Sequence, residues 1–205
     1  MNGHPTISQA IILWQESLSG VIKTHPTYLH IQYISHTTGV AESAYKIAQK
    51  CNLDPEKAYI LGLLHDYGKI QNEVHTGKTH FIVGYDEMMN KGFNGVANIC
   101  LSHSFPSKDF SFSNYTSYNI KDLERAKRIL SEREYDDYDR LIQLCDMFFE
   151  GINKVSYQER IDGICKRYNI TKEQVKDLED GAKANKEYFD NLCNQDIYEI
   201  LNIKN

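Results

Sequence analysis

Histidine and aspartate side chains interrupt apolar helical patterns at several places along this 205-residue chain. His36 lies one turn before Val40, and His103 lies one turn after Ile99, so each imidazole shares the inward face of its predicted helix. Three more such side chains end or interrupt apolar segments, namely His65, Asp66 and Asp146. A carboxylate is almost never fully buried unless another group pairs with it or coordinates it.

A divalent metal ion would satisfy these groups together, because neutral imidazole and carboxylate are usual ligands of zinc, iron, manganese and nickel. His65 and Asp66 are adjacent at a predicted helix end, where a loosened last turn lets both side chains face one ion. His36 and Asp146 would come from other helices, as in metal sites inside helical bundles. Two simpler interpretations stay open: each histidine could be a hydrogen-bonded core residue, and Asp146 could pair with a buried arginine or cap a helix.

The elements that must position these side chains are predicted to be helices almost throughout. Apolar periodicity and capping residues place helices at about 6–20, 37–51, 56–67, 80–90, 95–103, 121–132, 138–150, 156–168, 171–189 and 196–203. The segment 104–119 has no clear period, and loops of that length are often lids or binding segments. No internal repeat and no convincing strand pair is visible. We expect an all-α helical bundle, a single domain over 1–205 with packing helices at about 156–203.

The composition excludes several classes of protein. Lys+Arg is 23 and Asp+Glu is 28, so the net charge of −5 offers no electrostatic footprint for a nucleic-acid backbone. The apolar runs are far shorter than the roughly 18–20 residues that span a bilayer, and no signal peptide is visible at the start. We expect a cytoplasmic protein whose cysteines are reduced core residues without disulfides: Cys51, Cys100, Cys145, Cys165 and Cys193.

The ordered set of His36, the pair His65 and Asp66, and Asp146 resembles the H…HD…D signature of the HD-domain superfamily of metal-dependent phosphohydrolases. The sequence GLLHDYGK around the pair is similar to the central motif of that family, and HTTGVA and LIQLCD are similar to its first and last motifs. The resemblance covers roughly 33–151. It implies a helical bundle in which these four residues surround one metal ion.

The resemblance extends to members that bind a second metal ion through two further histidines. His80 and His103 stand at similar positions, and Asp66 would then bridge both ions. His80 is preferred over His75 because it begins a predicted helix and precedes Gly84, as in similar members, whereas His75 lies in a polar turn. The remaining histidines match no motif: His4, His25 and His30.

The resemblance implies a hydrolase in which metal-activated water cleaves a phosphate ester of a small molecule, such as a nucleotide. One or two divalent ions are expected, and His and Asp ligands do not decide among Fe, Mn, Zn, Ni and Co. Lys69, which follows the central motif, would meet a phosphate oxygen and contribute to catalysis, as similar members suggest. A solvated lysine at a helix C-terminus explains the same residue equally well.

The sequence allows two interpretations for several side chains around the predicted loop. Ser102 and Ser104 flank His103, where substrate contact and ordinary polarity are both compatible with the sequence. The aromatic residues of 104–119 are expected to pack onto the domain rather than to stack on a base. Three arginines after the loop are expected on a charged outer helix face, with phosphate contact as the alternative: Arg125, Arg128 and Arg133.

Two other functions would use the same residues. A di-iron HD-type oxygenase has the same ligands, and a non-catalytic metal-binding signalling module would need ions already saturated by protein ligands. The missing GYP tripeptide counts against one subgroup of cyclic-di-nucleotide phosphodiesterases, and the small size counts against a large stringent-response enzyme. We expect a small phosphorylated substrate and no nucleic-acid or membrane partner. The sequence leaves open whether the protein forms a homodimer.

Overall fold

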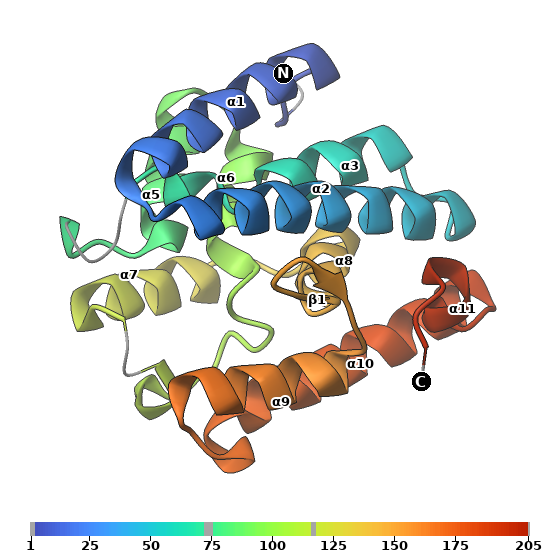
Figure 1. Ribbon diagram of the computed structural model, residues 1–205. Helices are drawn as coiled ribbons and strands as arrows, with labels where there is room; N and C mark the ends of the chain where they lie inside the picture. The colour runs from blue at the N-terminus through green and yellow to red at the C-terminus, as the bar shows by residue number, and fades with distance from the viewer. Residues whose placement is uncertain (1–2, 72–75, 116–117, 205) are drawn as a thin grey trace.

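The computed structural model describes residues 3–71, 76–115 and 118–204. It confirms the all-α prediction, because helices form nearly all of its regular structure and each of its two strands has two residues. Figure 1 shows the elements, which are, in chain order, α1 (Ile7–Thr24), α2 (Thr27–Lys50), α3 (Pro55–Leu64), η1 (Tyr67–Ile70), α5 (His80–Asn90), α6 (Asn94–Ser102), η2 (Phe112–Tyr115), α7 (Ile120–Ser131), α8 (Asp137–Asp146), β1 (Phe149–Glu150), β2 (Asn153–Lys154), α9 (Tyr157–Tyr168), η3 (Lys172–Val175), α10 (Lys176–Cys193) and α11 (Ile197–Leu201).

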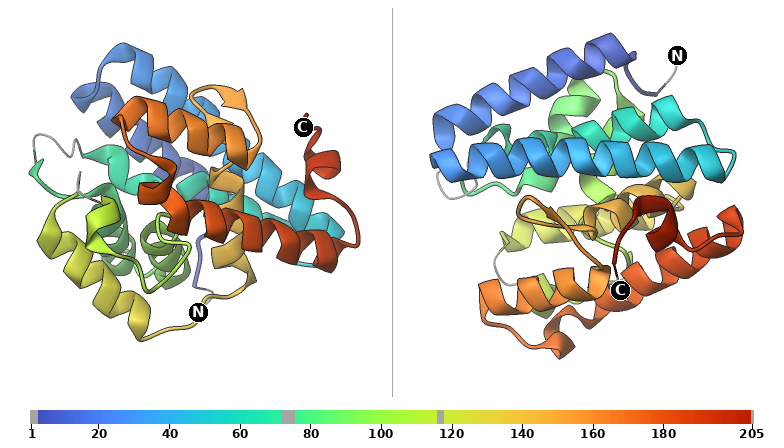
Figure 2. Two further views of the ribbon diagram at one scale, coloured as in Figure 1. Left: turned by 90° about the horizontal axis from the view of Figure 1, so that it is seen from below. Right: turned by 45° about the vertical axis from the view of Figure 1, so that its right-hand side comes forward.

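The helices are arranged around α8. Helices α1, α2 and α3 lie on one side of it, and α9 and α10 form a layer on the other side (Figure 1, Figure 2). Helix α2 packs along α3, and α8 contacts α2, α3, α6 and α10. The main apolar core lies between these helices and includes the fully buried side chains of Val40, Ile60, Leu64, Leu141 and Phe148.

Several helices begin where their first residues predict. The Asp54 side chain accepts a backbone N–H at the start of α3, and a proline follows at the first helical position. Ser156 and Glu159 form a capping box at the start of α9, and Thr171 and Gln174 form another at the start of η3. These local signals explain why the predicted starts in the C-terminal third of the chain are close to the observed ones.

Other boundaries differ from the predictions. The second helix begins at Thr27, ten residues earlier than expected, and α3 ends at Leu64 before a separate 3-10 turn. The helix expected over 138–150 ends at Asp146, and β1 then pairs antiparallel with β2 through a turn at Gly151, whose φ is +62°. The expectation of no strand pair is therefore wrong. Two-residue strands are too short to show an alternating pattern in the sequence.

Two glycines let the helices that carry the candidate residues approach one another. A Cβ added to Gly62 of α3 would lie 2.8 Å from the Cα of Ala41 in α2. Gly68 of η1 lies against the backbone carbonyl of His80, where no side chain fits. These contacts place the segment between α3 and η1 against both α2 and α5.

The aromatic side chains of the loop after α6 form a second apolar cluster with α5 and α7. Phe105 and Phe110 are buried, and their rings stack with centroids 4.3 Å apart. Phe81 and Leu130 complete this cluster from the two helices. The expectation that the loop aromatics pack onto the domain is confirmed for these two phenylalanines.

The structure pairs Cys51, directly after α2, with Cys193, the last residue of α10, in a disulfide bond. The expectation of no disulfide is therefore wrong for this pair, because 142 residues separate the two and no local spacing marks them. The other three cysteines, Cys100, Cys145 and Cys165, are free, and the first two of them are buried in the core. In the part of the chain that the structure describes, no helix combines the length and apolar character needed to cross a bilayer.

Candidate metal centre

All the histidines and aspartates predicted as metal ligands converge on one place inside the molecule, in overlapping groups that could hold metal ions. They are contributed by elements that are distant in the sequence. Most of them are buried, and the two at the edge of the cluster are partly exposed. They are His36 of α2, His65 and Asp66 directly after α3, His80 at the start of α5, His103 directly after α6, and Asp146 at the end of α8.

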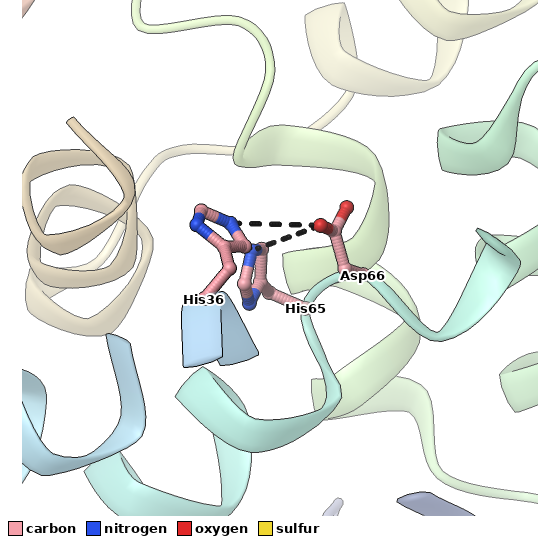
Figure 3. A group of neighbouring side chains, drawn as sticks. All are labelled: His36, His65 and Asp66. Atoms are coloured by element: carbon pink, nitrogen blue, oxygen red, sulfur yellow. Dashed lines mark hydrogen bonds and ion pairs between the residues drawn. The ribbon is translucent and has the colours of Figure 1, made fainter. Parts of the chain in front are cut away.

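One half of the cluster lies around one oxygen of Asp66. The Nε2 atoms of His36 and His65 are 3.1 Å apart, and each is 3.6 Å from Asp66 Oδ2 (Figure 3). Asp146 Oδ1 lies 3.0 Å from the His36 nitrogen and 4.0 Å from the His65 nitrogen. Four potential ligand atoms therefore point at one small region.

The other half lies around the second oxygen of the same carboxylate. The Nε2 atoms of His80 and His103 are 3.3 Å apart and lie 3.7 and 3.6 Å from Asp66 Oδ1. Each carboxylate oxygen of Asp66 thus faces a different pair of histidines. This is the arrangement expected of a carboxylate that bridges two metal positions.

Backbone carbonyls orient two of the imidazoles. His65 Nδ1 lies 2.7 Å from the carbonyl oxygen of Gly62, and His103 Nδ1 lies 3.2 Å from that of Ile99. A carbonyl only accepts hydrogen bonds, so Nδ1 of each ring carries a proton and Nε2 points into the cluster. Metal-binding histidines are commonly held by this kind of second hydrogen bond.

The protonation states also suit a cation. Burial lowers the pKa of His65 to about 3, so this imidazole is neutral near pH 7. Burial by itself raises the pKa of Asp66, but the Lys69 ammonium and the surrounding imidazoles hold that pKa well below its usual value. Burial likewise raises the pKa of Asp146, and the hydrogen bond from His36 outweighs it, so this pKa is also below its usual value. The cluster therefore combines ionised carboxylates with a neutral imidazole.

From the sequence, Asp146 could also pair with a buried arginine. A partly buried arginine does pair with a carboxylate of α8, but the carboxylate is Asp139, to which Arg133 donates two hydrogen bonds of 2.9 and 2.6 Å. Asp146 instead contacts the imidazoles of the cluster. The arrangement favours the metal interpretation for Asp146.

Lys69 lies at the cluster. Its Nζ donates to Asp66 Oδ2 at 2.6 Å, and 41% of its side chain is exposed. Burial lowers the pKa of Lys69, but the Asp66 carboxylate raises it more, so the net pKa is above its usual value and the amine is charged. A charged group that is partly buried beside the candidate ligands and partly open to solvent can meet an incoming anion.

The other polar groups that the sequence singled out are mostly engaged elsewhere. The Ser102 hydroxyl is buried and donates to Asp139 Oδ1 at 2.6 Å, so it supports the end of α6. Ser104 Oγ lies 3.1 Å from His103 Nε2, at the cluster itself. Arg125 pairs with Asp86 near the surface.

The histidines without a motif lie outside the cluster. His30 Nε2 contacts the backbone carbonyl of His25 at 2.8 Å, and His4 Nδ1 contacts that of Pro5 at 3.0 Å. His75 lies outside the described residues.

A cavity of about 330 Å³ opens beside the cluster, and its wall contains groups that the sequence analysis did not single out. This wall includes His103, Ser104 and Asp146, so the cavity adjoins the cluster. The amphipathic pattern of α9 could have indicated an inward face there, but not that this face meets the site. The lining residues that the sequence did not identify as candidates are charged, amide and aromatic: Asn114, Arg160, Arg167, Tyr168, Gln174 and Asp177.

Residues 33–149, more than half of the chain, match the family model described as HD domain. No curated protein and no solved structure gives a significant match to the chain. The chain therefore belongs to the HD-domain family, which is part of a superfamily of metal-dependent phosphohydrolases. The matched range contains all six residues of the cluster.

Proposed function

We propose that the protein is a phosphohydrolase that uses two divalent metal ions to cleave a phosphate ester of a small molecule, such as a nucleotide. The observation that carries this proposal is the position of Asp66, whose two carboxylate oxygens face two separate pairs of histidines. Membership of the HD-domain family supports the same class of reaction.

The donor atoms fit divalent ions by type and by spacing. Two ligand atoms at about 2.1 Å from one ion are about 3.0 Å apart in octahedral geometry and about 3.4 Å apart in tetrahedral geometry. The nitrogen pairs of 3.1 and 3.3 Å and the Asp66 contacts of 3.6 and 3.7 Å are close to these values. The residues proposed for the first ion are His36, His65, Asp66 and Asp146, and those for the second are Asp66, His80 and His103.

Bound divalent ions would supply activated water for attack and positive charge that stabilises the phosphoryl oxygens in the transition state. The residues of the chain provide the rest. Asp66 and Asp146 bring negative charge that holds the ions, and the hydrogen bonds from His65 and His103 to backbone carbonyls keep their imidazoles in one orientation. The Lys69 ammonium stands beside Asp66 and would bind an oxygen of the substrate phosphoryl group.

The proposal is tested by metal analysis combined with turnover. Protein prepared without chelator should contain about two divalent ions per chain and should release phosphate from at least one ester in a panel of p-nitrophenyl phosphate, sugar phosphates and nucleotides. Asp66→Ala should lose both the ions and the release. Asp86→Ala, which removes a carboxylate of α5 whose side chain is 44% exposed, is the matched control and should keep both.

Three results would contradict the proposal. Oxygen uptake without phosphate release would favour a di-iron oxygenase instead. Full metal content with neither reaction on any compound of the panel would favour a non-catalytic metal-binding module. Protein without metal after reconstitution would remove the basis of the proposal.

A further inference from the structure

Two arginines on α9 lie in the wall of the cavity beside the candidate metal centre. Arg160 and Arg167 are seven residues apart, so they share one face of the helix, and both line the cavity together with Asp146. Helix α9 follows the HD-domain match, which ends at residue 149. These arginines are therefore a feature of this chain outside the matched family range.

One carboxylate lies between the two guanidinium groups. Glu150 Oε2 accepts a hydrogen bond of 2.6 Å from Arg160 Nη1, and both oxygens of Glu150 lie 2.7 Å from Arg167 Nη2. Gly163, on the same face of α9, leaves the necessary room, because a Cβ there would lie 2.7 Å from the Glu150 Cδ. A single carboxylate cannot neutralise two guanidinium groups, so this cluster keeps one net positive charge.

Arg160 also has a hydrogen-bond donor that is not used by the protein. Its Nε is buried and has no hydrogen-bond partner among the described residues, although its Nη1 is bound to Glu150. An unpaired buried donor on a charged group is unfavourable, and a rotation of the Arg160 side chain that turns this N–H toward an oxyanion in the cavity would satisfy it. The planar guanidinium group matches the oxygen spacing of a phosphoryl group particularly well.

The rest of the cavity wall includes side chains that suit the body of an organic molecule. Tyr115 and Tyr118 of the loop side, and Ile164 and Ile170 of the α9 side, line the same space. The volume of about 330 Å³ is within the range of small-molecule sites. A molecule held by anionic groups at the candidate metal centre and at the arginines would thus have apolar and aromatic side chains to pack against, beside the polar groups of the same wall.

We propose that Arg160 and Arg167 bind a second phosphoryl group of the substrate, so that the substrate carries one phosphoryl group at the metal centre and another at α9. This inference rests on the proposed function for the position of the first group. It narrows the substrate class from phosphate esters in general to small molecules with at least two phosphoryl groups.

The test measures binding without turnover. Alkane bisphosphonates with one to six carbons between the phosphonates are titrated into the metal-loaded protein by calorimetry, and each is compared with the alkyl monophosphonate of the same length. At least one spacer length should bind about 10- to 100-fold more tightly than its monophosphonate, as expected for charge-assisted hydrogen bonds to a second anion. Arg160→Gln should remove most of this advantage.

Matched variants separate the role of α9 from a general loss of charge. Arg125→Gln also removes an arginine that pairs with a carboxylate, but this arginine does not line the cavity, so the bisphosphonate advantage should stay unchanged. Arg167→Gln, at a side chain that is 42% exposed, should reduce the advantage and serves as the second variant if Arg160→Gln fails to fold. Circular dichroism and thermal unfolding verify that each variant is folded.

Two results would overturn the inference: no bisphosphonate binds better than its monophosphonate, or the advantage is the same in the wild type and both α9 variants. Phosphate release from the full panel of p-nitrophenyl phosphate, sugar phosphates and nucleotides, measured on the same wild-type preparation, tests the proposed function separately. Release without a bisphosphonate advantage overturns only the assignment of α9. An advantage that depends on Arg160, without any release, supports the second anion site and contradicts the hydrolase proposal.

Discussion

The carboxylate of Asp139 should contribute far more to stability than that of Asp86, although each pairs with one arginine through two hydrogen bonds. Asp139 is fully buried, and besides Arg133 it accepts hydrogen bonds from the Ser102 hydroxyl at 2.6 Å and the Asp136 N–H at 2.9 Å. The Asp86 side chain is 44% exposed, and the side chain of its partner is 37% exposed.

The expected magnitudes follow from burial. Asp139→Ala leaves Arg133, whose side chain is 21% exposed, without its carboxylate partner, and removal of one partner from a buried ion pair costs about 3–5 kcal/mol. Asp86→Ala removes a surface ion pair and should cost about 0–1 kcal/mol. Because Ser102 immediately precedes His103, Asp139→Ala should also weaken binding of the second metal ion.

Urea unfolding of the two variants, followed by circular dichroism, measures this difference. Asp139→Asn, which keeps the shape and one acceptor, should lose less than Asp139→Ala, and it provides a folded variant if the alanine variant does not fold. Substitution of both Asp139 and Arg133 by leucine should recover part of the loss, because no unpaired charge is left. If Asp139→Ala and Asp86→Ala destabilise the protein equally, the reasoning from burial is refuted.

Further predictions concern metal content, the disulfide and pH. Asp66→Ala should lose both ions and His80→Ala only one, as measured by elemental analysis; two ions retained by His80→Ala would contradict the assignment of His80. Cys193→Ser opens a loop that the disulfide closes across 142 residues, and in the chain-entropy model this lowers the unfolding free energy by up to about 5 kcal/mol. Chemical denaturation under oxidising conditions measures the loss. Equal stability of variant and wild type would contradict the disulfide. The pKa of His65 falls from 6.5 in the unfolded chain to about 3 in the folded one, so the unfolded chain binds more protons between these values. Protein from which a chelator has removed metal should therefore become less stable as the pH falls below about 6.5. His65→Gln should reduce the change of the unfolding free energy with pH between pH 6.5 and 5. An unchanged pH dependence would contradict burial of a neutral imidazole.

Much of the local structure follows from the sequence, because neighbouring residues determine it. The helix over 80–90 has the predicted bounds, and the capping boxes at Ser156 and Thr171 form as expected. A capping side chain contacts a backbone group only two or three residues away, so its pattern is visible in a short window. The predicted helix ends are less accurate after Leu64 and Asp146, where the chain leaves a helix at the candidate metal centre.

The sequence by itself determined the ordered histidine and aspartate motif, the HD-domain family and the helical class, because these depend on residue type, order and short spacing. Tertiary structure alone decided which distant groups meet: Arg133 with Asp139, Cys51 with Cys193, and the arginines of α9 with the cavity. Such contacts arise from the packing angles and lengths of whole helices, and no local periodicity encodes them. Asp66 illustrates both contributions. The sequence motif identifies this residue, and only the fold places a pair of histidines beside each of its carboxylate oxygens.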